Sequence, residues 1–235
     1  DAYGHGAIQC ARAATKEQVD YIGVGIIQEG IELRESGITS PILILGGIYP
    51  NEIEDLIKHD LSTSLSNSVM ANAISKQAEH ANKRVGIHIK IDTGMGRLGV
   101  QPDAFTNLVE NVITCKNLKI EGFFTHLSSA DEEDPETTHH QISIFSNLLQ
   151  GLPATNFSKM ISANKHILFH SANTAGLLRF PESRFNLVRP GISLFGSFPS
   201  PTIASVFNLL EKENKITKLR PVMSLKTKII QIQTL

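Results

Sequence analysis

A chain of 235 residues with 41% apolar and 19% charged residues can bury a sizeable core, which excludes a disordered protein. Its formal net charge of -1 argues against a general nucleic-acid or anionic-membrane surface, because such surfaces need clustered lysine and arginine. The two cysteines, Cys10 and Cys115, lie far apart in the sequence and form neither a disulfide framework nor a paired metal site. Reduced thiols of this kind fit a cytoplasmic protein.

No apolar run in the sequence is long enough to span a bilayer, and no signal peptide is visible. The first residue, Asp1, is not methionine, and the chain stops at Leu235 inside a pattern typical of a strand. We therefore expect a chain that is trimmed at both ends.

Short apolar segments alternate with helical patterns along most of the chain. The predicted strands are 21–25, 42–45, 61–65, 85–91, 118–125, 167–170 and 187–188, and the predicted helices are 8–16, 27–35, 51–59, 69–83, 102–112, 137–149 and 173–178. Strands that are apolar on both faces and separated by helices form parallel sheets covered by helices. The pattern predicts about seven strand–helix units, which fit either a doubly wound sheet or a (β/α)8 TIM-like barrel lacking its first strand.

The rhythm changes beyond Pro201, where residues 221–232 alternate polar and apolar side chains in the manner of a strand. We interpret this change as the start of a second, antiparallel domain. The sequence thus predicts a barrel domain over residues 1–205 and the beginning of a C-terminal β-domain over residues 206–235.

A glycine-rich loop, residues 90–99 (KIDTGMGRLG), follows a predicted strand and contains a GxGxxG match. A dinucleotide-binding fingerprint opens directly into a helix and places an acidic residue at the end of the next strand. Here the helix begins only near Pro102, and Glu121 lies in the middle of its strand, so a dinucleotide is disfavoured. Arg97 among the glycines instead favours another anionic ligand.

Several polar or basic residues share a position at or just after the carboxyl ends of predicted strands. These residues are Tyr3, Arg97, His126, Thr174 and Arg189, and the apolar Leu45 occupies the same kind of position. Each alone also fits a structural role, such as helix capping by Thr174. In a parallel barrel, however, these ends meet on one face. Two arginines, a histidine and hydroxyls without a carboxylate cluster or a metal-ligand set suit a phosphorylated organic cofactor.

Five stretches together resemble the alanine racemases: residues 1–6 (DAYGHG), 90–99, His126, 170–174 (HSANT) and 189–196 (RPGISLFG). They occur in the family's order along nearly the whole chain. The resemblance implies a pyridoxal 5'-phosphate enzyme with a (β/α)8 barrel followed by a β-domain. It also implies interconversion of L- and D-alanine for peptidoglycan in the bacterial cytoplasm, by a head-to-tail homodimer with shared active sites.

The resemblance assigns a phosphate site to the two ends of the chain. Tyr3 and Thr174 would supply hydroxyls and Ile192 a backbone N–H, with Asn173 and Gly191 beside them. The family often has serine where this chain has Thr174, and the hydroxyl is retained.

The resemblance also assigns the surroundings of the pyridine ring. Leu45 would form an apolar wall, and His126 would pack on the ring and hydrogen-bond toward the catalytic tyrosine. Arg189 would be the partner of the pyridine nitrogen, and Arg97 would lie near the pyridine oxygen and the substrate carboxylate. Lys90 matches a lysine that is carbamylated in some members, where it positions that arginine. Arg97, His126 and Arg189 are thus the catalytic candidates, and no metal is implied.

Arg189 has a chemical consequence in this assignment. An arginine cannot give up its proton in a protein, so the pyridine nitrogen stays unprotonated and accepts a hydrogen bond. The negative charge that forms at Cα is then less delocalised into the ring. That arrangement disfavours transamination and suits reprotonation at Cα.

Racemisation needs one base on each face of the substrate. In the family these are the lysine that carries the cofactor, two residues before the position of Asp1, and a tyrosine of the partner subunit, beyond the position of Leu235. We therefore predict that this chain alone cannot bind the cofactor covalently and is inactive. The alternatives are a racemase of another amino acid, such as serine, and a non-catalytic barrel that binds pyridoxal phosphate.

Overall fold

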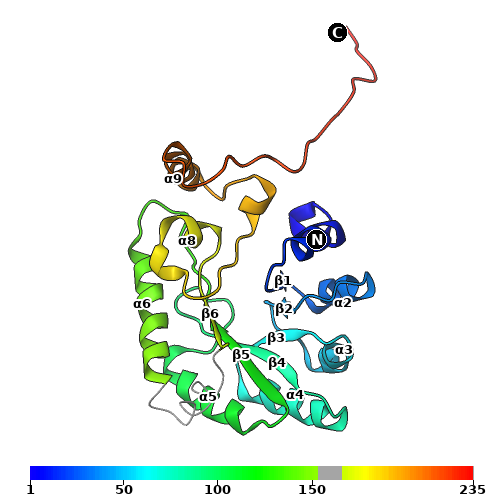
Figure 1. Cartoon of the computed structure of the whole chain (residues 1–235), viewed down its shortest axis with the longest axis vertical. Helices are drawn as coiled ribbons and strands as arrows, with labels where there is room; N and C mark the ends of the chain where they lie inside the picture. The colour runs from blue at the N-terminus through cyan, green and yellow to red at the C-terminus, as the bar shows by residue number, and fades with distance from the viewer. Residues whose placement is uncertain (153–165, 235) are drawn as a thin grey trace.

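The structure is a computed structural model that describes residues 1–152 and 166–234, and its centre is a curled parallel sheet (Figure 1). The six strands of this sheet are β1 (Ile22–Val24), β2 (Ile42–Ile44), β3 (Ser62–Leu65), β4 (Val85–Lys90), β5 (Leu118–Phe124) and β6 (Leu168–His170). Each strand pairs in parallel with the next one along the chain. A doubly wound sheet reverses its strand order, so this sequential order confirms the predicted TIM-like barrel type.

Helices lie before the first strand, between consecutive strands and after the last strand, and those between the strands cover the outside of the curled sheet (Figure 1). They are α1 (Ala7–Lys16), α2 (Ile27–Glu35), α3 (Ile53–Lys58), α4 (Ser68–His80), α5 (Phe105–Thr114), α6 (Glu136–Gly151), α8 (Thr174–Arg179) and α9 (Pro201–Lys212). Short 3-10 turns begin at Pro50 and Pro102, where the sequence predicts the starts of two α-helices. Proline suits a first turn because its missing N–H would have no partner there.

The apolar core lies between the sheet and the covering helices. Buried side chains such as Ile44, Ile87 and Phe123 on the strands pack with Phe105 of α5 and Phe145 of α6. A smaller cluster joins α6, α8 and α9 and comprises Leu127, Ala130, Ile142, Ala175, Phe180 and Ile203. Because alternate strand residues face opposite ways, the inner face of the sheet remains for polar side chains.

The predicted strand at 187–188 is not formed as a ladder strand. The segment nevertheless runs beside β6, since Asn186 N donates to Phe169 O at 3.3 Å and Arg189 N donates to Ala172 O at 2.9 Å. Pro190 has no N–H with which to continue the ladder. Arg189 therefore sits where the next strand of a barrel would begin.

The C-terminal segment differs from its prediction. Residues 221–232 form no strand in the structure, and their apolar side chains are exposed, with Leu225 and Ile230 each 98% accessible. A strand needs a neighbour to accept its hydrogen bonds. Val222 N donates to Phe195 O at 3.1 Å, but beyond Val222 the segment runs away from the other elements (Figure 1). The sequence prediction also missed α9, although Ser200, which accepts from Ile203 N, and Pro201 form a typical helix start.

Helix α9 spans the predicted boundary between residues 205 and 206, so the division into two domains stays a prediction. Among the described residues, none of the helices has the length and apolar character needed to cross a membrane.

Candidate active site

The glycine-rich loop after β4 closes on its own base. Asp92 N donates to Val100 O at 2.9 Å, and Val100 N donates to Lys90 O at 2.8 Å. Gly99 has a positive φ of 137°, and a Cβ there would lie 2.4 Å from Asp92 N. Only glycine permits this close return. A dinucleotide fingerprint opens into a helix instead, so the loop geometry removes that alternative.

The tip of the same loop is organised by one carboxylate. Asp92 Oδ1 accepts hydrogen bonds from Gly94 N and Gly96 N, each at 3.0 Å. Burial works to raise the pKa of Asp92, but these backbone N–H groups outweigh it and hold the pKa below its usual value. The charged carboxylate thereby fixes the backbone that presents the exposed side chain of Arg97.

Lys90 lies at the end of β4 with only 6% of its surface accessible. Its Nζ donates to Leu45 O at 3.5 Å and lies 5.4 Å from the centroid of the Phe124 ring. Burial, followed by repulsion from Arg97 and Arg189, lowers the pKa of Lys90 to about 8. A substantial fraction of this amine is therefore uncharged in mildly alkaline solution.

His126 follows β5 and faces the same three cations. Burial, followed by repulsion from Arg189, Arg97 and Lys90 in that order, lowers the pKa of His126 to about 4. The imidazole is consequently neutral at pH 7. These electrostatic influences and the contacts of Lys90 and Arg189 with the Phe124 ring place Arg97, His126, Arg189 and Lys90 near one another.

Arg189 is anchored from three sides. Its NH1 group donates to His170 Nδ1 at 2.6 Å, and its NH2 group donates to Thr125 O at 2.8 Å and to Ser171 O at 3.1 Å. Its guanidinium carbon lies 5.4 Å from the centroid of the Phe124 ring. Burial lowers the pKa of Arg189 to about 10, so the group stays protonated at pH 7. These contacts use three of the five N–H groups of a guanidinium.

A group of hydroxyls and backbone N–H groups lies beside the arginine. Thr174 Oγ1 accepts from Gly191 N at 3.0 Å and lies 3.3 Å from Ser193 Oγ. A Cβ at Gly191 would lie 2.6 Å from Tyr3 Oη, so glycine lets the tyrosine hydroxyl approach the same point. Ile192 opens a 3-10 helix, and the first N–H groups of a helix have no partner within it.

Two other predicted cofactor residues have clear local roles. Asn173 caps α8, because its Oδ1 accepts from Gly176 N at 2.9 Å while its Nδ2 donates to Leu127 O at 3.3 Å. A Cβ on Gly23 would lie 3.1 Å from Leu45 Cδ1, so the Leu45 side chain lies against the middle of β1. Contact of either residue with a cofactor stays a prediction.

The sequence prediction did not include Ser193 or Gln141. Gln141 of α6 is 1% accessible, and its Nε2 donates to Thr93 Oγ1 at 3.3 Å and to His126 O at 3.1 Å. Its Oε1 accepts from Ser128 N at 2.9 Å. A glutamine in the middle of a helix gives no sequence signal of this role, whereas Ser193 stands within the glycine-containing segment that the prediction did single out.

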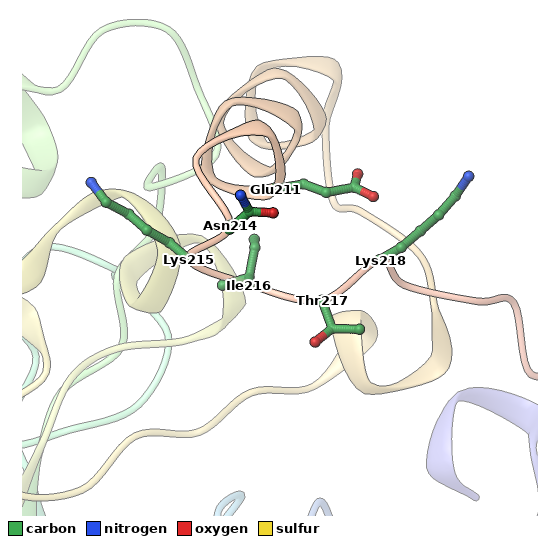
Figure 2. A pocket seen from close by; sticks show the side chains of 6 residues that line it. All are labelled: Glu211, Asn214, Lys215, Ile216, Thr217 and Lys218. Atoms are coloured by element: carbon green, nitrogen blue, oxygen red, sulfur yellow. The ribbon is translucent and has the colours of Figure 1, made fainter.

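A hollow of about 360 Å³ opens at the carboxyl ends of β1 to β4, with Lys90 and Leu98 in its wall. A second hollow, of about 410 Å³, lies on the surface beyond α9 and contains none of the predicted site residues. Figure 2 shows that Lys215 and Lys218 in its wall point away from each other. The described residues contain no group of histidine, cysteine and acidic side chains that could hold a metal ion.

Known proteins resemble this chain in sequence and in fold. The family model described as "Alanine racemase, N-terminal domain" matches residues 1–199. An alanine racemase of Carboxydothermus hydrogenoformans is 36% identical over 99% of this chain and 59% of its own length. The solved alanine racemase of Clostridium difficile 630 has a TM-score of 0.86 at 35% identity, covering 99% of this chain and 60% of that one.

A solved complex of the Clostridium difficile 630 enzyme with cycloserine gives a TM-score of 0.82 at 34% identity. That match covers 94% of this chain and 57% of the other. The chain thus spans less than two thirds of the length of these relatives.

Proposed function

Because this chain belongs to the alanine racemase family, we propose that the protein containing it interconverts L- and D-alanine with pyridoxal 5'-phosphate as cofactor. The observation that carries the proposal is the convergence of Arg97, Arg189, Lys90 and His126 beside a cradle of hydroxyl groups. The bound cofactor supplies an electron-withdrawing ring that stabilises negative charge at the Cα of alanine.

The hydroxyl cradle fits a phosphate group. Tyr3 Oη, Thr174 Oγ1 and Ser193 Oγ surround Gly191, where even one methyl group would collide with the tyrosine. Hydroxyls and the backbone N–H of Ile192 supply the donors that a phosphate needs. We propose that these residues hold the cofactor phosphate.

Arg189 and His126 fit the ring of the cofactor. Arg189 keeps two N–H groups beyond those used by His170, Thr125 and Ser171, and one of them would donate to the pyridine nitrogen. A protonated arginine cannot transfer that proton, so the nitrogen stays neutral. The neutral imidazole of His126 can pack on the ring without adding a positive charge, with Leu45 as the apolar wall.

Arg97 and Lys90 fit the substrate end of the site. The exposed guanidinium of Arg97 can bind the carboxylate of alanine with paired hydrogen bonds. Lys90 has its pKa lowered to about 8, so its neutral amine is available to add carbon dioxide and release one proton to solvent, which forms a carbamate. The carbamate would place a negative charge beside Arg97 and orient it. We propose that the two proton-transfer bases, the lysine and tyrosine of the family resemblance, lie outside residues 1–235.

We further propose a homodimer in the cytoplasm that supplies D-alanine for peptidoglycan. Exposed apolar side chains at the mouth of the site support a second copy there, since Ile26, Tyr49 and Leu98 line the hollow while being 55%, 73% and 42% accessible. Such a concentration of exposed apolar groups is typical of an interaction surface. The exposed apolar segment 221–232 likewise supports the start of a C-terminal β-domain.

The experiment incubates the full-length protein and pyridoxal phosphate with L-alanine or with L-serine and measures the D-enantiomer. We expect D-alanine to form, and we expect the 235-residue chain alone to be inactive. Preferential formation of D-serine would show that serine, not alanine, is the main substrate. A protein that binds the cofactor but racemises neither amino acid would overturn the proposal in favour of a non-catalytic binding protein.

A further inference from the structure

Two buried histidines lie beneath Arg189 on the inner face of the sheet. His88 is on β4 and His170 ends β6, and both are inaccessible to solvent. The three side chains form a chain of hydrogen bonds: Arg189 NH1 lies 2.6 Å from His170 Nδ1, and His170 Nε2 lies 2.9 Å from His88 Nδ1. The function proposed above uses Arg189 but not His88.

Arg189 determines the direction of both hydrogen bonds that link it to His170 and His170 to His88. A guanidinium only donates, so His170 Nδ1 must accept and its proton must be on Nε2. His170 Nε2 then donates to His88 Nδ1, and the proton of His88 must in turn be on Nε2. A second proton on His170 would be on Nδ1 and would face an N–H of Arg189. A second proton on His88 would be on Nδ1 and would face the Nε2–H of His170.

Burying His88 leaves one of its polar atoms without a partner, so filling space does not explain why a histidine stands at this position. Among the described residues, no acceptor pairs with His88 Nε2, and an unsatisfied buried donor destabilises a fold. Strand β5 also makes room for the ring, because a Cβ at Gly122 would lie 2.5 Å from His88 Nδ1. An apolar residue would avoid the unpaired donor, so the contact made through Nδ1 distinguishes histidine from a mere space filler.

We propose that His88 is a positioning residue, whose Nδ1 holds His170 in the one tautomer that can accept a hydrogen bond from Arg189. Without that acceptor, His170 Nε2–H loses its partner and the tautomer with a proton on Nδ1 becomes competitive. That proton would point at an N–H of Arg189 and displace the guanidinium. This inference rests on the proposed function, because the consequence of the displacement is a loosened contact between Arg189 and the pyridine nitrogen.

The test uses the full-length protein loaded with pyridoxal phosphate and two variants at one position. His88→Asn keeps an acceptor oxygen near the position of Nδ1, whereas His88→Leu removes it at similar volume. Pyruvate is the product that alanine gives when transamination replaces racemisation. We expect His88→Leu to raise the amount of pyruvate formed per racemisation event by about tenfold, which corresponds to losing one hydrogen bond to a charged group. We expect His88→Asn to stay within about twofold of the unmodified protein.

Nitrogen-15 NMR of labelled histidine supplies the readout that a purely structural role would not move. We expect protons on Nε2 of both His88 and His170 in the unmodified protein, and a mixture of His170 tautomers in His88→Leu. A proton on His170 Nδ1 in the unmodified protein, or an unchanged pyruvate ratio in His88→Leu, would overturn the inference. If the protein does not racemise alanine, the proposed function fails, but the tautomers measured by NMR still test this inference. If His88→Leu does not fold, the tautomers of the unmodified protein still test it.

Discussion

The two ends of the sheet's inner face hold charge in opposite ways. Toward the amino end, the carboxylate of Glu121, which extends from the middle of β5, accepts hydrogen bonds from Tyr21 at 3.2 Å, Ser62 at 2.8 Å and Lys119 at 2.8 Å. Gly86 leaves the space that this carboxylate fills, since a Cβ there would lie 2.2 Å from Glu121 Oε2.

At the carboxyl end, Lys90, Arg97 and Arg189 lie near one another, and the nearby carboxylate of Asp92 is already bound to its own loop. Glu121 is a charged group whose hydrogen-bond donors are all supplied by the protein. Arg97 and Arg189 repel the amine of Lys90, and an anionic ligand would relieve that repulsion. The difference teaches that an uncompensated cluster of like charge marks a binding site, whereas a buried charge with a full set of partners marks structure.

The largest expected effect comes from the cationic end. Replacing Arg97 by methionine removes the proposed carboxylate partner, and we expect kcat/KM for L-alanine to fall about 100- to 1000-fold, as for the loss of one charge-stabilising donor. Because Arg97 is exposed, the melting temperature should not fall.

The matched control for this change is Arg12→Gln on α1, which alters an exposed arginine outside the site. Rates of D-alanine formation and thermal unfolding of both full-length variants check the prediction. Equal activity in the two variants would show that Arg97 is not a binding group.

The opposite pattern is expected at the amino end. Burial works to raise the pKa of Glu121, but hydrogen bonds from Lys119 and Ser62 hold it below its usual value. Replacing Glu121 by glutamine keeps the shape and removes the charge, so we expect a loss of about 1 to 3 kcal/mol in the free energy of unfolding. Denaturant titration measures the loss, and kcat of the folded protein should stay unchanged. A drop in kcat without a change in stability would reverse the assignment of the two ends.

A change of opposite sign is expected for Lys90. Replacing Lys90 by methionine removes a buried cation that, within residues 1–152 and 166–234, makes a single weak hydrogen bond, to Leu45 O at 3.5 Å. Apolar replacement of a buried charge is often stabilising, and we expect the unliganded protein to gain about 1 to 2 kcal/mol at neutral pH. Thermal unfolding before and after addition of cofactor and substrate measures the gain. A destabilised Lys90→Met protein would mean that the lysine already has a stabilising partner.

The smallest effect at neutral pH concerns His126, which is uncharged there in both the folded and the unfolded protein. Its folded pKa of about 4 lies below the ordinary value of 6.5, so the unfolded state binds more protons between these two values. Stability should therefore fall as pH drops from 6.5 toward 4.

In His126→Gln, the dependence of melting temperature on pH should be shallower over that range, while the exposed control His80→Gln should match the unmodified protein. A parallel pH profile in His126→Gln would show that the imidazole carries no such penalty.

Much of the fold follows from local sequence pattern. Continuous apolar runs such as Ile42–Ile44 and the helical periodicity of Ile27–Glu35 determine their elements without long-range information. Parallel strands also bring their carboxyl ends to one face, which is why Arg97, His126 and Arg189 could be placed together in advance. The exposed segment 221–232 shows the limit, because an alternating pattern forms a strand only where another strand accepts its hydrogen bonds.

The supporting contacts of the site could not be predicted, because they join residues far apart in sequence. His88 and His170 lie on different strands, and each alone looks like an ordinary buried histidine. Gln141 occupies a helix, where nothing in its neighbours indicates hydrogen bonds to Thr93 and His126. Sequence pattern therefore predicts which residues face a ligand better than which residues hold them in place.

The ordered backbone of the loop that presents Arg97 lowers the entropy cost of binding a ligand. Its base is closed by the hydrogen bonds between Asp92, Val100 and Lys90, and its tip is tied to the Asp92 carboxylate. Ordering the backbone of a free loop costs about 1 to 2 kcal/mol per residue. This backbone is already ordered before a ligand arrives, so binding has only the rotamers of Arg97 left to fix. The loop thus offers a preorganised cation, so changes in binding strength at this point depend on the side chain and not on the loop backbone.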